Sequence, residues 1–246
     1  MSGLPDCLID LGHSRIKWAC GKDGRVVMGS EDACSIDQID RLQQALTRNT
    51  CQRALVSGQT NTDVLDAVTT LLQQTGLSLH AVTTGIPKLP VQPAYPQLGC
   101  DRWLALQPPW LEQRKGFCVV DCGTAITVDL VDDSGRHRGG WIMAGLSSLR
   151  HGLLSRARRL PAPADDDVEL SMPATDSARA IGAGTLLQAI GGIEQAITCC
   201  EALLGRPIVP YLGGGDAGLI AAGLKRPLLR DDQLVLKGLA LAAECQ

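Results

Sequence analysis

An acidic and a basic side chain stand next to each other at Asp101-Arg102, in the segment QLGCDRWLAL, where a turn passes into an apolar helix. The carboxylate could accept a proton from a hydroxyl group, and the guanidinium could neutralise a substrate carboxylate or a phosphoryl group in transfer. In the structural alternative, Asp101 caps the helix and Arg102 forms a surface ion pair. The chemical interpretation points to phosphoryl transfer, which needs positioning more than covalent chemistry.

Two turns of the pattern Asp-x-Gly indicate a site for a phosphate. They lie in CLIDLGHSRIKWACGKDGRVV and in CVVDCGTAITVDLVDDSGRHR, which align with an offset of 111 residues. Glycine lets backbone N–H groups approach a phosphate, a hydroxyl at Ser14 or Thr124 adds a donor, and the aspartate can hold a cation. Ordinary hairpins also contain Asp-x-Gly, but its recurrence at one offset favours a single nucleotide held from two sides. The offset places Asp10 on Asp121, Gly12 on Gly123 and Gly24 on Gly135.

The sequence around these turns alternates between strand patterns and helix patterns, and these elements would hold the turns in position. Each turn lies between two apolar strands and so predicts a hairpin, and the alternation after the first hairpin predicts an α/β fold. The four prolines from Gly85 to Pro96 predict an irregular loop leading into the Asp101 helix. The expected elements are helices at 35–49, 63–74, 184–203 and 234–245, strands at 53–57 and 79–83, and a strand, turn and helix start at 208–220.

The repeat predicts two similar halves in a chain of 246 residues. Residues 1–117 are expected to carry the first phosphate hairpin and the substrate loop, and residues 118–246 the second hairpin and helices that form a dimer. Gly191-Gly192 interrupts one of these helices at a cost of about 1 kcal/mol per glycine relative to alanine. We therefore expect close helix packing or a subunit contact at this position.

Composition excludes several other classes of function. The net charge is −3 and the chain has only four Trp, two Tyr and one Phe, which disfavours binding to nucleic acid. We see no signal peptide and no apolar run near the length of a membrane span, so we expect a cytoplasmic chain without membrane attachment. The ten cysteines contain no CxxC pair, which predicts reduced thiols and no structural zinc.

Three segments together resemble the type III pantothenate kinases, a branch of the acetate and sugar kinase, Hsp70 and actin superfamily. They are IDLGHSRIK, QLGCDRWLAL and DCGTAITVD, and the resemblance extends over almost the whole chain. It implies duplicated ribonuclease H-like (actin-like ATPase) halves, each a mixed β-sheet with flanking helices. It also implies ATP-dependent phosphorylation of pantothenate to 4'-phosphopantothenate, the first step of coenzyme A biosynthesis, by a homodimer.

The resemblance implies a role for each matching residue. Asp101 would be the catalytic base, Asp10 would hold Mg²⁺, and Asp121 would hold a monovalent cation, K⁺ or NH₄⁺. Ser177 would reach pantothenate from the neighbouring subunit, with Thr175 as a rival. The residues expected at the pantothenate site are Tyr95, Gly99, Cys100, Asp101, Arg102 and Ser177. Those expected around ATP are Asp10, Leu11, Gly12, His13, Ser14, Arg15, Ile16, Lys17, Gly123 and Thr124.

Four positions depart from the family pattern. His13 replaces an asparagine near the phosphates, Ala144 replaces a proline, and Gly213 replaces a threonine. Gln92 stands where the family has a tyrosine that contacts the substrate, and Tyr95 is the nearby alternative. The imidazole of His13 also adds a titrating group beside the phosphates.

These departures motivate a second hypothesis, a nucleotide-binding regulatory or accessory protein that kept the fold and lost turnover. The presence of Asp101-Arg102 argues against it, because a binding module needs no base beside a substrate loop. A third hypothesis is a kinase of the same superfamily that acts on another small molecule, and a screen of substrates would distinguish it.

Overall fold

The computed structural model describes residues 3–58, 62–164 and 169–245, and it divides the chain into two compact units. The first contains the residues up to Lys115 together with Ser134–His137 and the segment from Gln233 onwards. The second contains Gly116–Asp133 and Arg138–Asp232. The chain thus crosses between units close to the expected boundary at 117/118, whereas its last helix falls in the first unit instead of the second.

A mixed sheet forms the centre of the first unit. Its strand order is β3-β2-β1-β5-β6, with β4 paired to β2. β1 and β2 form the expected antiparallel hairpin, and β5 and β6 continue the sheet in parallel, as crossover helices require. The strands are β1 (Asp6–Leu11), β2 (Arg15–Lys22), β3 (Arg25–Val26), β4 (Asp32–Ser35), β5 (Arg53–Ser57) and β6 (Ser78–Ala81).

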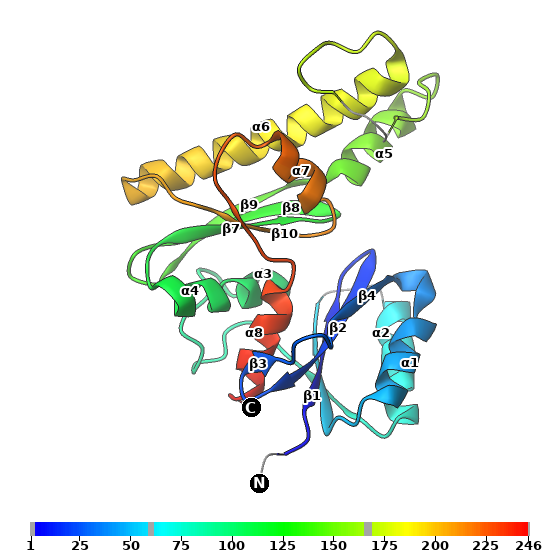
Figure 1. The fold of residues 1–246 in the computed structure, drawn as a ribbon, viewed down its shortest axis with the longest axis vertical. Coiled ribbons are helices and arrows are strands. Elements are labelled where there is room, and N and C mark those ends of the chain that lie inside the picture. The colour runs from blue at the N-terminus through cyan, green and yellow to red at the C-terminus, as the bar shows by residue number, and fades with distance from the viewer. Residues whose placement is uncertain (1–2, 59–61, 165–168, 246) are drawn as a thin grey trace. The chain divides into compact units, whose positions relative to one another are not determined.

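Helices cover both faces of this sheet (Figure 1). α1 (Asp40–Arg48) and α2 (Thr62–Gln74) pack on the face formed by Ile9 and its neighbours, and α3 (Cys100–Ala105) and α8 (Leu234–Ala243) pack on the opposite face. α4 (Gln107–Gln113) follows α3.

The helix expected at 35–49 is shorter than predicted. Ser35 pairs with Arg15 of β2, which keeps the backbone extended at that point. A 3-10 turn at Ile36–Gln38 then precedes α1. The apolar spacing marked the helical segment correctly but carried no information about this strand pairing.

The second unit repeats the sheet of the first. Its order is β11-β10-β7-β8-β9, so the hairpin β7–β8 corresponds to β1–β2, and β10 corresponds to β5 as the parallel neighbour of the first strand. The duplicated α/β fold expected from the 111-residue offset is thereby confirmed. The strands are β7 (Phe117–Cys122), β8 (Ala125–Val131), β9 (His137–Ala144), β10 (Tyr211–Gly213) and β11 (Leu229–Arg230).

The long helix α6 (Ser177–Leu204) lies across this second sheet, with α5 (Leu146–Arg156) and α7 (Ala217–Gly223) beside it (Figure 1). It begins seven residues before the expected start, because the Asp176 side chain accepts a bond of 2.9 Å from the Arg179 N–H and caps the helix. A Cβ at Gly192 would lie 2.9 Å from the sulfur of Met143, so close packing explains that glycine. No helix in the described ranges is long and apolar enough to span a membrane.

Candidate active site

Asp10 lies at the end of β1 on the sheet face that carries α3. It pairs with Lys17 across the hairpin, and directly opposed residues of two antiparallel strands share a face. The carboxylate is buried, and its Oδ1 accepts a bond of 3.1 Å from the hydroxyl of Ser57. The sequence did not reveal Ser57 as a site residue, because only the parallel register of β1 and β5 brings it beside Asp10.

The tip of the first hairpin is exposed where a phosphate could bind. The Gly12 N–H donates to the Arg15 carbonyl at 2.9 Å, and His13 and Ser14 between them are exposed. Leu11 and Ile16 lie on either side of the tip, and both side chains are buried in the core against α1 and α2. Of the residues expected around ATP, these two can therefore contribute only backbone atoms.

The substrate loop ends at Gly99, which precedes the first turn of α3. Asp101 is exposed there, and within the described part of the chain its carboxylate makes no capping hydrogen bond to the helix. The carboxylate folds back towards the loop, because a Cβ at Gly99 would lie only 2.6 Å from Asp101 Oδ1. The helix-cap interpretation of Asp101 is therefore wrong, and Gly99 is needed for the position of the carboxylate.

Arg102 points towards the loop that precedes it. Its Nη1 donates to the hydroxyl of Tyr95 at 3.2 Å, and both side chains are half-buried. The structure thus brings Tyr95 to the Asp101-Arg102 pair. Gln92 takes a different role, because its amide donates to the carbonyls of Ile86 and Leu89 inside the loop.

Cys100 connects the start of α3 with the backbone just after β6. Its side chain is buried and its thiol donates to the Val82 carbonyl at 3.1 Å, so only its backbone is available to a substrate. Burial raises the pKa of this thiol to about 12, and the negative charges of Asp101 and Asp10 act on the pKa in the same direction. Asp10, in β1, and Asp101, at the start of α3, both belong to the first unit.

The second hairpin has the same design with a tighter turn. Asp121 pairs with Thr127, whereas the equivalent Asp10 pairs with Lys17, so the offset between the second strands is 110 instead of 111. Thr124 is exposed at the tip, and its carbonyl accepts bonds from the Gly145 N–H and the Ser148 hydroxyl. The N-terminus of α5 thus fixes this turn.

In both halves a glycine follows the strand that pairs in parallel with the first strand, β5 in the first unit and β10 in the second. Gly58 has φ +116° and would place a Cβ 2.1 Å from the Leu11 carbonyl, and Gly214 has φ +102° and would place one 2.5 Å from the Cys122 backbone. Leu11 and Cys122 are themselves related by the repeat. Gly213 stands in register with Asp121 as Ser57 does with Asp10, and a side chain there would meet the Asp231 carbonyl at 2.7 Å.

Ser177 lies at the exposed start of α6. It borders a groove of about 310 Å³ whose walls come from α5, α6 and the segment between them. Thr175 is exposed two residues earlier. The lining consists of Leu153, Leu160, Ser177, Ala180, Ile181, Gly184, Thr185 and Gln188.

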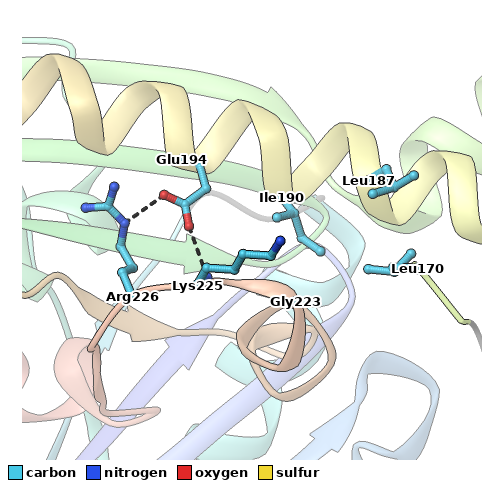
Figure 2. A pocket seen from close by; sticks show the side chains of 7 residues that line it. All are labelled: Leu170, Leu187, Ile190, Glu194, Gly223, Lys225 and Arg226. Carbon is cyan, nitrogen blue, oxygen red and sulfur yellow. Dashed lines mark hydrogen bonds and ion pairs between the residues drawn. The ribbon is translucent and has the colours of Figure 1, made fainter. Parts of the chain in front are cut away.

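Figure 2 shows a second groove of the same unit, about 340 Å³, between α6 and the segment after α7. Glu194 accepts a bond of 2.7 Å from Arg226 Nε and one of 3.3 Å from the Lys225 N–H, and Arg226 also pairs with Glu201 at 3.0 Å. These bonds attach the segment after α7 to α6. Among the described residues, no group of three or more His, Cys, Asp or Glu side chains is arranged to hold a metal ion.

The two mixed sheets with flanking helices are the duplicated ribonuclease H-like (actin-like ATPase) fold that the sequence predicts. A Baf family protein of Campylobacter jejuni superimposes with a TM-score of 0.62 at 19% identity, covering 97% of this chain and 98% of its own. Component A of (R)-2-hydroxyglutaryl-CoA dehydratase from Acidaminococcus fermentans does so with a TM-score of 0.53 at 13% identity, covering 98% and 96%. At these identities the likeness shows the fold alone.

Sequence comparison defines the family. The sequence model of the type III pantothenate kinase family matches residues 7–198. A type III pantothenate kinase of Pseudomonas paraeruginosa is 35% identical, covering 95% of this chain and 97% of the relative, and one of Laribacter hongkongensis is 33% identical with 95% and 96% covered. The chain belongs to the type III pantothenate kinase family.

Proposed function

We propose that this chain transfers the γ-phosphoryl group of ATP to the primary hydroxyl of pantothenate, with Asp101 as the base. The observation that carries the assignment is the exposed Asp101 carboxylate at the start of α3, in a chain that aligns over 95% of its length with a type III pantothenate kinase. As the hydroxyl oxygen forms its bond to the γ-phosphorus, the bond to the β-phosphate oxygen breaks and Asp101 takes the hydroxyl proton. The products are 4'-phosphopantothenate and ADP.

Arg102 and Tyr95 are assigned to the acidic end of pantothenate. A guanidinium can bind a carboxylate with two hydrogen bonds, and the 3.2 Å contact to the Tyr95 hydroxyl supports Arg102 in one orientation. We assign to Tyr95 the role of the family's substrate-contacting tyrosine, whose usual position is occupied here by Gln92. The Gly99 and Cys100 backbones complete this side of the site.

The two hairpin tips are assigned to the phosphates of ATP. Ser14 at one tip and Thr124 at the other supply hydroxyls, and Lys17 supplies a positive charge. Gly12 and Gly123 let the phosphates approach the backbone closely, while their own N–H groups close the turns by donating to the Arg15 and Ala125 carbonyls. His13 and Arg15 are exposed beside the first tip, and His13 occupies the position of the family's asparagine.

Asp10 is the residue we assign to Mg²⁺. This ion is usually held by one or two carboxylates together with substrate phosphates, so a single oriented carboxylate fits it. When bound, Mg²⁺ would neutralise charge on the phosphate oxygens. Asp121, at the equivalent place in the second half, is assigned to a monovalent cation, K⁺ or NH₄⁺.

A second copy of the chain is assigned to the remaining substrate contact, which makes the enzyme a homodimer. Ser177 lies exposed at the start of α6 and Thr175 precedes it, so either hydroxyl could extend to a neighbouring subunit. Alanine variants at the two positions would distinguish them by the KM for pantothenate, and sedimentation would measure the dimer.

The decisive experiment measures ATP-dependent phosphorylation of pantothenate by the full chain, with and without K⁺ or NH₄⁺, for the wild type and for Asp101→Asn. We expect activity that requires the cation and a fall in kcat of about 10²- to 10⁴-fold in the variant. Asp66→Asn, on the exposed surface of α2, is the matched control and should retain full activity. Wild-type protein that binds ATP yet leaves pantothenate unmodified under these conditions would overturn the assignment.

A further inference from the structure

The proline-rich loop that carries Tyr95 is fixed at two points. Near its middle, the fully buried Gln107 accepts a bond from the Val91 N–H at 3.0 Å and donates to the Val91 carbonyl at 3.0 Å. The indole N–H of Trp103 donates to the same carbonyl at 2.7 Å. Three side-chain bonds to one residue hold the loop to α3 and α4 at Val91.

The second point lies at Ala94, immediately before Tyr95. The Ala94 N–H donates to Nδ1 of His137 at 3.2 Å, and the His137 ring lies 6.2 Å from the Tyr95 ring at an angle of 39°. His137 is buried, and it belongs to the short segment Ser134–His137 that is part of the first unit. One imidazole thus contacts the Tyr95 side chain and holds the backbone next to it.

We infer that His137 is a positioning residue for the pantothenate site. Its Nδ1 and its ring fix Tyr95, the Tyr95 hydroxyl fixes Arg102 through the 3.2 Å contact, and Arg102 stands beside the base Asp101. His137 touches neither substrate nor the reacting atoms in this assignment. Its effect is to restrict the guanidinium to one orientation before the substrate carboxylate arrives, which lowers the ordering cost of binding.

The hydrogen bond from the Ala94 N–H requires an acceptor atom at position 137. Nδ1 accepts a hydrogen bond and therefore carries no proton, which an asparagine Oδ1 can imitate and a leucine cannot. His137→Asn retains an acceptor for the Ala94 N–H, and His137→Leu fills similar space but leaves that N–H without it. Comparison of the two variants separates the hydrogen bond from packing.

The test compares His137→Leu, His137→Asn and the control His80→Leu, which replaces a partly exposed histidine of β6. For His137→Leu we expect a rise of about tenfold in the KM for pantothenate, with kcat and the KM for ATP changed less than about twofold. His137→Asn should recover most of the wild-type KM, and His80→Leu should behave as the wild type. A fall in kcat with an unchanged KM for pantothenate, equal in both His137 variants, would overturn the positioning role.

The inference rests on the proposed function only for the identity of the ligand that Arg102 binds. A second measurement, which needs no turnover, therefore tests the positioning of the loop by itself. Hydrogen exchange followed by mass spectrometry should show faster exchange over residues 91–98 in His137→Leu than in His137→Asn, with the rest of the chain unchanged. Equal exchange in the two variants would overturn the inference even if the wild type phosphorylates pantothenate. Faster exchange in His137→Leu, together with a wild type that lacks that activity, would refute the proposed function and retain the positioning role.

Discussion

Replacement of Gly99 by alanine tests the position of the catalytic carboxylate. The added Cβ would lie 2.6 Å from Asp101 Oδ1, and ordinary contact begins at 3.4 Å, so the oxygen must move by about 0.8 Å. Misplacement of a reacting group by about 1 Å can cost about 10²-fold in rate. We therefore expect kcat to fall between about 10-fold and 100-fold, measured as ADP release at saturating ATP and pantothenate.

The same substitution should leave the fold intact. Gly99 has φ −54° and ψ 136°, which alanine adopts without strain, and the atom in the way is the end of a side chain. The free energy of unfolding should change by less than about 1 kcal/mol. Gly152→Ala in α5 is the control, because a Cβ there meets no described atom within 4 Å and a helical alanine is favoured. A Gly99→Ala enzyme with wild-type kcat would refute the assignment of Asp101 in its observed position.

Three further substitutions and measurements test other contacts of the fold. Ser57→Ala removes the bond to Asp10 and should raise the KM for MgATP about fivefold, with the unfolding midpoint nearly unchanged; an unaltered KM at limiting Mg²⁺ would contradict this. Gly214→Ala forces φ +102° on alanine and a 2.5 Å contact with Cys122, so urea unfolding should show a loss of about 3 kcal/mol. The pKa of Cys100 rises from 9.0 to about 12, so its thiol should resist alkylation by iodoacetamide at pH 8. The neutral thiol should contribute its full share of stability below pH 9, and that contribution should be lost as the pH rises towards 12. Cys100→Ala should weaken that alkaline decline.

The hairpins could be predicted because their signals are local. Each needs only a run of apolar residues, a glycine and a second run, and the repeat at one offset relates Asp10 to Asp121 from the order of residues alone. Asp101 and Arg102 could also be predicted from a local signal, because they are adjacent in the sequence and stand where a helix begins. The duplicated order of the strands follows from the same pattern.

The supports of the site could not be predicted, because each acts over a long stretch of chain. Ser57 reaches Asp10 across 47 positions, His137 reaches Ala94 across 43, and Gln107 reaches Val91 across 16. A single serine, histidine or glutamine has no periodicity that marks it, and its partner depends on strand register and loop path. Such residues become recognisable only when the fold brings the partners together.

The C-terminal helix α8 has a consequence for how the protein is made. Leu236 and Leu239 of α8 are buried in one core with Leu8 and Trp103, yet they are synthesised after every segment of the second unit. The nascent second unit can therefore close its core while the first unit still exposes apolar side chains to chaperones and proteases. A ribosome that stops before residue 234 releases a second unit able to fold and a first unit without one wall of its core, so quality control should remove such fragments through their older, N-terminal half.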